Sequence, residues 1–139
     1  MPGVTLEGVS KVYPGGVRAV DDVSLVVDEG EFVTLVGPSG CGKTTTLRTI
    51  AGFEQATAGT VGIAGMEVNE TPPDGRDTGM VFQDFALFPH MTVAENIAYG
   101  LEVRGEDDET IDARVQEMLE LVELPETADR KPTQLSGGQ

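Results

Sequence analysis

The chain has 139 residues, of which 24 are acidic and 9 are basic, and its formal net charge is −15. This length corresponds to one domain or part of one, and the acidic balance argues against a protein that binds a nucleic-acid backbone. A single cysteine excludes an internal disulfide framework and fits a reducing compartment; there is no secretory signal and no apolar run of the ~18 residues that span a bilayer, so any membrane role requires a partner.

Two strands joined by a tight turn are predicted at the start of the chain. Residues 4–13 (VTLEGVSKVY) and 18–27 (RAVDDVSLVV) are rich in β-branched residues, and Pro14-Gly15-Gly16 between them is a turn sequence. A second turn, Asp28-Glu29-Gly30, precedes residues 31–37 (EFVTLVG), a short apolar run typical of a buried parallel strand. We therefore expect an antiparallel sheet that leads into a parallel strand.

The segment GPSGCGKTT, residues 37–45, has the spacing of a phosphate-binding loop. Glycines allow successive backbone N–H groups to point inward and let phosphate oxygens approach closely. A lysine ammonium is suited to bridging the β and γ phosphates, and a threonine hydroxyl is a hard-oxygen ligand for Mg²⁺. The sequence TTTLRTIAG that follows predicts a helix with its positive end facing the anion. The predicted phosphate-binding residues are Gly37, Ser39, Gly40, Cys41, Gly42, Lys43, Thr44 and Thr45, with Thr44 also a ligand of the metal.

The next segment alternates short apolar runs with turns. Residues 60–68 (TVGIAGMEV) predict one or two short strands, and residues 71–75 (TPPDG) predict a turn. Residues 77–83 (DTGMVFQ) predict a further strand. We expect these strands to complete the first part of the chain.

The hydrophobic period becomes helical after residue 90. Thr92 and Glu95 have the spacing of a capping box, which predicts a helix from Val93 to about Val103. Four apolar residues then recur at spacings of 4, 3 and 4, and we expect them to form the buried face of a second helix. They are Ile111, Val115, Met118 and Val122.

Three motifs in this order resemble the ATP-binding subunit of an ABC transporter: the loop at 37–45, MVFQDFALFPHMTVAENI at 80–97, and ADRKPTQLSGGQ at 128–139. Within that family the chain is similar to importer ATPases for maltose and related sugars, polyamines, ferric iron or oxyanions. The resemblance implies an α/β fold of the P-loop NTPase type, a truncated RecA-like core with an N-terminal antiparallel β subdomain and a helical subdomain. Residues 1–83 correspond to the β subdomain and P-loop core, and residues 84–139 to the helical subdomain up to the signature motif.

The resemblance also assigns roles outside the phosphate loop. Tyr13 stands where the family places an aromatic ring that stacks on adenine. Gln83 matches the glutamine of the Q-loop, a catalytic residue whose amide reaches Mg²⁺ or the attacking water. The LSGGQ signature contacts the γ-phosphate bound by a second subunit, and it places Ser136, Gly137, Gly138 and Gln139 at that nucleotide.

The implied assembly is a head-to-tail dimer, either a homodimer or a pair of related ATPase subunits, with ATP and Mg²⁺ between the subunits. Hydrolysis would drive a transmembrane permease at the cytoplasmic face of the membrane, and an external substrate-binding protein would deliver the solute. The acidic charge and the importer-like segment at 85–101 count against a soluble ABC ATPase of DNA repair or translation.

The family continues past LSGGQ to a metal-binding Asp, a catalytic Glu and a switch His, which residues 1–139 do not include. We therefore expect nucleotide binding without turnover from these residues alone, and a weakly stable fold with an exposed apolar edge. A non-catalytic nucleotide-binding fragment remains the alternative interpretation.

Overall fold

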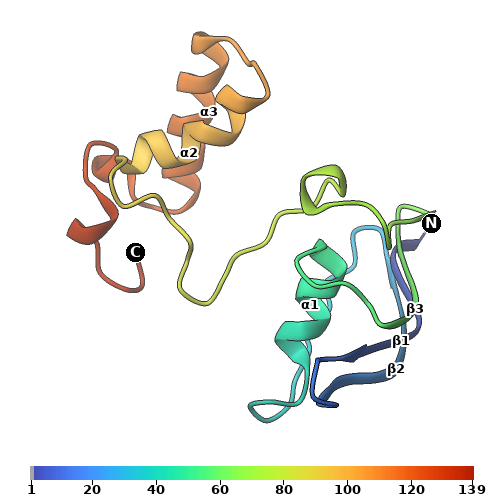
Figure 1. The fold of residues 1–139 in the computed structure, drawn as a ribbon. Helices are drawn as coiled ribbons and strands as arrows, with labels where there is room; N and C mark the ends of the chain where they lie inside the picture. Colours follow the sequence, from blue (N-terminus) through green and yellow to red (C-terminus); the bar gives the residue numbers. More distant parts are fainter. Residues whose placement is uncertain (1) are drawn as a thin grey trace. The chain divides into compact units, whose positions relative to one another are not determined.

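The computed structural model describes residues 2–139, which form two compact units. The N-terminal unit extends to Met80, and the helical unit comprises Val81–Gln139. Figure 1 shows the elements of each unit. The boundary falls within the stretch from 77 to 83 in which a strand was expected.

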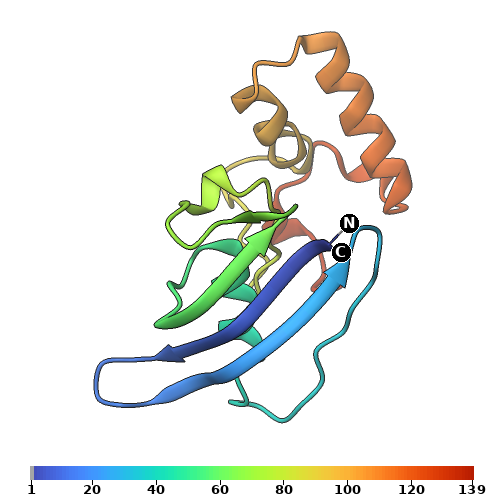
Figure 2. The same ribbon diagram turned by 90° about the vertical axis from the view of Figure 1, so that its right-hand side faces the viewer.

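A four-stranded antiparallel sheet forms the N-terminal unit. β1 (Pro2–Val12) pairs with β2 (Arg18–Asp28) on one side and with β3 (Ala58–Ile63) on the other, and β3 pairs with the short β4 (Met66–Glu67). The two long strands of the hairpin run side by side in Figure 2. The predicted hairpin and the predicted short strands within residues 60–68 are therefore confirmed.

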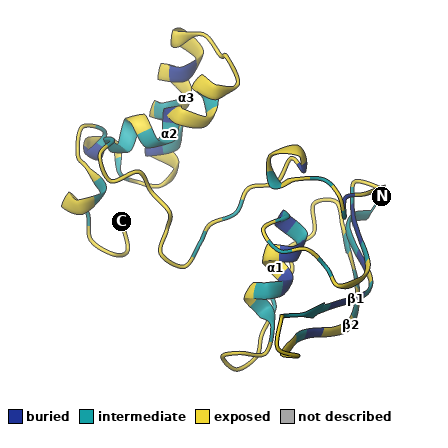
Figure 3. Cartoon of the chain, in the orientation of Figure 1, coloured by how far each residue is buried: buried dark blue, intermediate teal, exposed yellow. Residues whose placement is uncertain are grey.

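The core of this unit lies on one face of the sheet. Buried side chains from β1, β2, β3 and the loop after β4 form one apolar cluster. Ile50 of α1 (Lys43–Ala51) packs against this cluster. Figure 3 shows buried residues on the strands and on the inner side of α1. This packing fixes the helix that follows the phosphate loop. The cluster consists of Leu6, Val9, Val20, Val61 and Val68.

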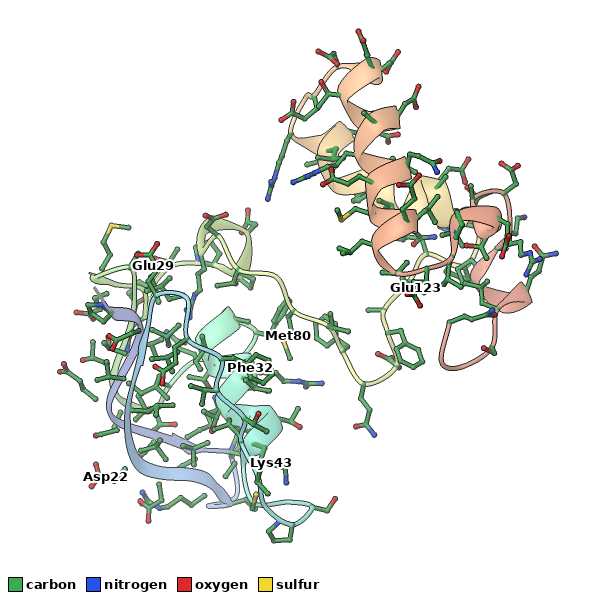
Figure 4. All side chains as sticks on the ribbon, turned by 180° about the vertical axis from the view of Figure 1, so that it is seen from behind. Asp22, Glu29, Phe32, Lys43, Met80 and Glu123 are labelled. Carbon is green, nitrogen blue, oxygen red and sulfur yellow. The ribbon has the colours of Figure 1, made fainter. Side chains whose placement is uncertain are left out.

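Two predicted strands are not formed. Residues 31–37 and 77–83 have no strand structure, and several of their apolar side chains are exposed: Phe32 by 92%, Val36 by 89% and Val81 by 85%. Phe32 projects from the ribbon in Figure 4. A strand exists only where a neighbouring strand pairs with its backbone groups, and the described residues supply no such neighbour for either segment. The apolar composition was recognised correctly, but the predicted strand state was wrong.

Two helices form the helical unit. α2 (Val93–Val103) has the predicted capping box, because the Thr92 side chain accepts from the Glu95 amide and the Glu95 carboxylate accepts from the Thr92 amide. α3 (Asp108–Leu121) is capped by Asp107 and packs on α2. The described residues also form three single turns of 3-10 helix: η1 (Pro73–Gly75) in the N-terminal unit, and η2 (Pro125–Thr127) and η3 (Pro132–Gln134) in the helical unit.

The predicted buried face of α3 is correct for Ile111 and wrong for Val122. Val122 is 59% exposed because it is the residue at which the helix ends, and Leu119, at 1% exposed, is the most buried residue of α3. Val115 and Met118 are half-buried. None of the described helices is both long enough and apolar enough to cross a membrane.

Candidate nucleotide-binding site

The phosphate loop reaches α1 through a glycine that no other residue can replace without strain. Gly42 is the N-cap of α1, with φ 96°, and a β-carbon there would overlap the carbonyl oxygen of Ala19 in β2. Both the left-handed backbone and the close approach to β2 require glycine. The loop is therefore fixed to the sheet at this point, so its position is set by the core of the unit.

The Lys43 ammonium lies within the loop. Its Nζ donates to the carbonyl oxygens of Gly37 and Pro38, the latter at 2.8 Å, and lies 3.4 Å from Sγ of Cys41. A β-carbon on Gly37 would come within 2.7 Å of that sulfur, so the loop closes tightly around these atoms. The loop thus surrounds a positive charge carried on a flexible stem, which suits recognition of an anion.

The N-terminus of α1 differs from those of α2 and α3. The side chains of Thr92 and Asp107 cap α2 and α3, and both helices carry acidic residues in their first turn. α1 has no side-chain cap and no acid in its first turn, and its first helical hydrogen bond runs from the Thr46 amide to the Gly42 oxygen. The amides of Lys43, Thr44 and Thr45 therefore have no acceptor within the helix. Uncapped amides, the helix dipole and a lysine are features that together favour binding of an anion.

The opposite end of α1 is held by Arg76, a residue that the sequence analysis missed. Its Nε donates to the Thr71 oxygen at 2.7 Å, and its Nη1 donates to the oxygens of Thr49 and Ile50 at 2.9 and 3.0 Å. Arg76 is 5% exposed, and burial lowers the pKa of its guanidinium. A positive charge at the C-terminal carbonyls complements the helix dipole. One basic residue within a turn carries no sequence signal for this role.

Tyr13 is half-buried at the end of β1, in the turn that leads to β2. Its amide donates to the Val17 oxygen at 2.8 Å, and Lys11 Nζ lies 5.1 Å from the centre of its ring. Figures 1 and 2 both show this turn at the same end of the N-terminal unit as the phosphate loop. The contact of Gly42 with Ala19, close to this turn, agrees with that placement.

The other predicted site residues belong to the helical unit. Gln83 is exposed, and Phe85 and Ala86 follow it with positive φ values of 68° and 50°, a conformation that side chains disfavour. The signature residues form a small closed turn, in which the Ser136 amide donates to Oε1 of Gln139 at 2.9 Å and the Gln139 amide donates to the Ser136 oxygen at 3.1 Å. This turn leaves Gly137 and Gly138 exposed.

Comparison with known sequences identifies the family. The sequence model of the family described as "ABC transporter" matches residues 20–139. The spermidine/putrescine import ATP-binding protein PotA of Thermobifida fusca is 55% identical over the whole chain, and the sn-glycerol-3-phosphate import ATP-binding protein UgpC of Rhodopseudomonas palustris is 53% identical. The chain spans 37% and 38% of the lengths of these two relatives.

Solved structures share the fold. The ATP-binding cassette MJ0796, described as a dimer in a post-hydrolysis state bound to ADP and Pi, is 39% identical, with a TM-score of 0.88 over 98% of this chain and 64% of that one. A second dimeric structure of the same cassette gives a TM-score of 0.89 at 37% identity. The fold is therefore the α/β fold of P-loop ATPase cassettes, and the chain belongs to the ABC transporter family.

Proposed function

We propose that this chain is the N-terminal part of an ATP-binding subunit that energises solute import through a membrane permease. The observation that carries the proposal is the N-terminus of α1, where uncapped amides and Lys43 converge, in contrast to the side-chain caps of α2 and α3. The names of the similar proteins, both import ATP-binding proteins, support the direction of transport. Because the chain spans less than two fifths of their length, hydrolysis and transport are proposed for the full-length protein.

The proposed binding mode uses backbone and side-chain groups of the loop. The glycines and the first amides of α1 would hold the phosphates, Lys43 would neutralise their charge, and the Thr44 hydroxyl would be a ligand of Mg²⁺. Bound Mg²⁺ supplies neutralisation of the charge that develops during phosphoryl transfer. Tyr13 would stack on the base, and Gln83 would approach the metal or the attacking water through its uncharged amide. A β-carbon built on Gly40 would meet no atom within 4 Å, and this open space beside the loop supports the proposal.

The signature turn is proposed to bind the nucleotide of a second subunit. Ser136 and its two following glycines are exposed and present a hydroxyl and unhindered amides. The dimeric state of the similar cassette MJ0796 supports this arrangement. ATP would then lie between two copies, and opening of the dimer after hydrolysis would drive the permease.

The transported solute is proposed to be selected outside this chain. PotA is named for a polycation and UgpC for a phosphate ester, yet both are nearly equally similar to this chain. Import ATP-binding proteins named for solutes of opposite charge are thus similar to the same chain, which supports selection of the solute by the permease and the substrate-binding protein.

The test is replacement of Lys43 by alanine in the full-length protein. We expect the dissociation constant for a fluorescent ATP analogue to rise about tenfold to a hundredfold, the range that corresponds to loss of hydrogen bonds from a charged group. Arg48→Ala is the matched control, because it removes one positive charge from the same helix, at an exposed position in its last turn. Equal affinity in Lys43→Ala and the parent protein would contradict the proposal.

A further inference from the structure

We propose that the first turn of α2 is a junction that positions the signature residues and ties them to the loop formed by residues 88–92. The inference rests on the proposed function in one respect, namely that Ser136 contacts the nucleotide of a second subunit. The junction lies entirely within the helical unit, and its residues have no role in the phosphate loop.

Two backbone hydrogen bonds attach the segment before the signature to α2. The Val93 amide donates to the Arg130 oxygen at 2.7 Å, and the Ala94 amide donates to the Ala128 oxygen at 3.0 Å. These amides occupy the first two positions of the helix, where no acceptor exists within the helix itself. A distant segment of chain thus satisfies them, in addition to the Thr92 cap.

The connection from Arg130 to Ser136 is stiff. η3 brings the Lys131 amide to Oε1 of Gln134 at 2.8 Å, and the Leu135 amide donates to the Pro132 oxygen at 3.1 Å. Proline fixes its own φ at the start of this turn. Pro132 and Leu135 also line an apolar groove of about 270 Å³ together with Val93 and Ile97 of α2, so the segment lies beside that helix. A displacement of α2 therefore moves the signature turn with it.

The side chain of Asn96, in the first turn of α2, attaches the loop formed by residues 88–92 to the helix. Its Oδ1 accepts from the Phe88 amide at 2.8 Å, and its Nδ2 donates to the oxygens of Phe88, Met91 and Thr92 at 3.1, 3.3 and 2.9 Å. This one side chain uses both its donor and its acceptor groups on the loop. Asn96 and Leu135 also line the same groove. The loop and the signature segment thus share one support.

Val93→Pro in the full-length protein removes one half of the junction. Proline is tolerated at the first helical position, and the preceding residue already has the extended conformation that proline requires, with ψ 170° at Thr92. The substitution therefore deletes the hydrogen bond to Arg130 while the helix is kept. We expect nucleotide binding to the phosphate loop to change less than twofold. We expect the dimerisation constant measured with a non-hydrolysable ATP analogue to weaken about threefold to tenfold.

Asp108→Pro is the matched control for that variant. Asp108 occupies the first position of α3, its cap Asp107 is equally extended with ψ 158°, and its amide makes no bond to a distant segment among the described residues. We expect Asp108→Pro to leave both constants unchanged. An equal loss of dimerisation in this control, or a loss of nucleotide binding in Val93→Pro, would overturn the proposal because either result indicates a general structural defect.

Asn96→Asp tests transmission across the junction. Aspartate keeps the acceptor for Phe88 but cannot donate to the three carbonyls. We expect hydrogen exchange to accelerate in residues 88–92 and also at the amides of Leu135 and Gln139, on the far side of the junction. Asn69→Asp, in a turn of the N-terminal unit where Asn69 bonds to Val61 and Gly59, is the control and should affect neither. Unchanged exchange at Leu135 in Asn96→Asp would overturn the junction.

If the parent protein binds nucleotide but does not dimerise, the proposed function of Ser136 fails and the junction has no functional role. If the parent dimerises and Val93→Pro dimerises equally well, only the junction fails. The two failures are therefore distinguishable in one set of measurements.

Discussion

The charged side chain of Asp107 caps the N-terminus of α3. Its Oδ1 accepts from the Thr110 amide at 2.7 Å and caps α3. The backbone hydrogen bond from Thr110, followed by the side-chain hydrogen bond from the same residue, lowers the pKa of the Asp107 carboxyl, and desolvation opposes this weakly. Because the folded-state pKa lies below the unfolded one, the ionised cap stabilises α3 at neutral pH. That contribution is lost as the pH falls through the folded pKa.

We therefore predict that an NMR titration of the Thr110 amide has a midpoint below the ordinary pKa of aspartate. Asp107→Ser provides the control, because a serine hydroxyl caps the helix without titrating. In that variant the acid transition of the Thr110 amide should disappear while α3 persists at neutral pH. A midpoint at or above the ordinary value would show that the cap does not favour the charged form.

At the scale of the element, the end of α3 is a Schellman motif built on a residue that disfavours it. The Leu124 amide donates to the Leu119 oxygen at 2.9 Å, the Glu123 amide donates to the Glu120 oxygen at 3.0 Å, and Glu123 has φ 60°. Leu119 and Leu124 line the same apolar groove, at the two positions between which this motif commonly has a hydrophobic contact. Figure 4 labels Glu123 at this end of the helix.

Glu123→Gly should stabilise the chain by up to about 1 kcal/mol, because glycine adopts the left-handed conformation without a steric cost. Glu120→Gly, one turn earlier in the helix, should destabilise it by about 1 kcal/mol. Urea unfolding of the two variants beside the parent protein measures both effects. Equal destabilisation by the two substitutions would mean that Glu123 is not strained in solution.

The elements that could be predicted from the sequence are those with local signals. The capping box that marks the start of α2 lies within four consecutive residues, from Thr92 to Glu95, and the turn at 14–16 marks the hairpin. Residues 31–37 and 77–83 have the amino-acid composition of strands but no partner strand. The composition of a segment does not indicate whether another strand is present to pair with it. The phosphate loop with Lys43 could be predicted because the spacing of its glycines, lysine and threonine lies within nine consecutive residues. Arg76 and Asn96 were missed because their acceptors are backbone oxygens, which any residue provides.

At the scale of the whole molecule, charge is distributed unevenly between the two units. The N-terminal unit has eleven acidic and five basic residues, whereas the shorter helical unit has thirteen acidic and four basic residues. Residues 102–130 alone carry eleven acids and three bases. The described residues form only three ion pairs, two of them between exposed neighbours on the chain. Repulsion within the helical unit is therefore largely uncompensated.

Four acidic residues line one groove between α2 and α3, where like charges repel one another: Glu95, Glu102, Asp108 and Asp112. Glu102 lies near the C-terminus of α2, where the helix dipole disfavours an anion, and Asp112 lies one turn from Asp108. Both are exposed. Neutral amides at these two positions would remove charge without removing any hydrogen bond that the structure contains.

We predict that the thermal midpoint of the full-length protein rises with KCl and levels off near 1 M, because the screening length falls from about 10 Å at 0.1 M to about 3 Å at 1 M. The double variant Glu102→Gln/Asp112→Asn should melt higher than the parent at low salt and gain less from KCl, since part of the repulsion has been removed. Sucrose, which is uncharged, should raise the two midpoints equally. A flat KCl curve for the parent would mean that the acidic surface carries no destabilising repulsion. An equal KCl gain in parent and variant would place that repulsion elsewhere than between α2 and α3.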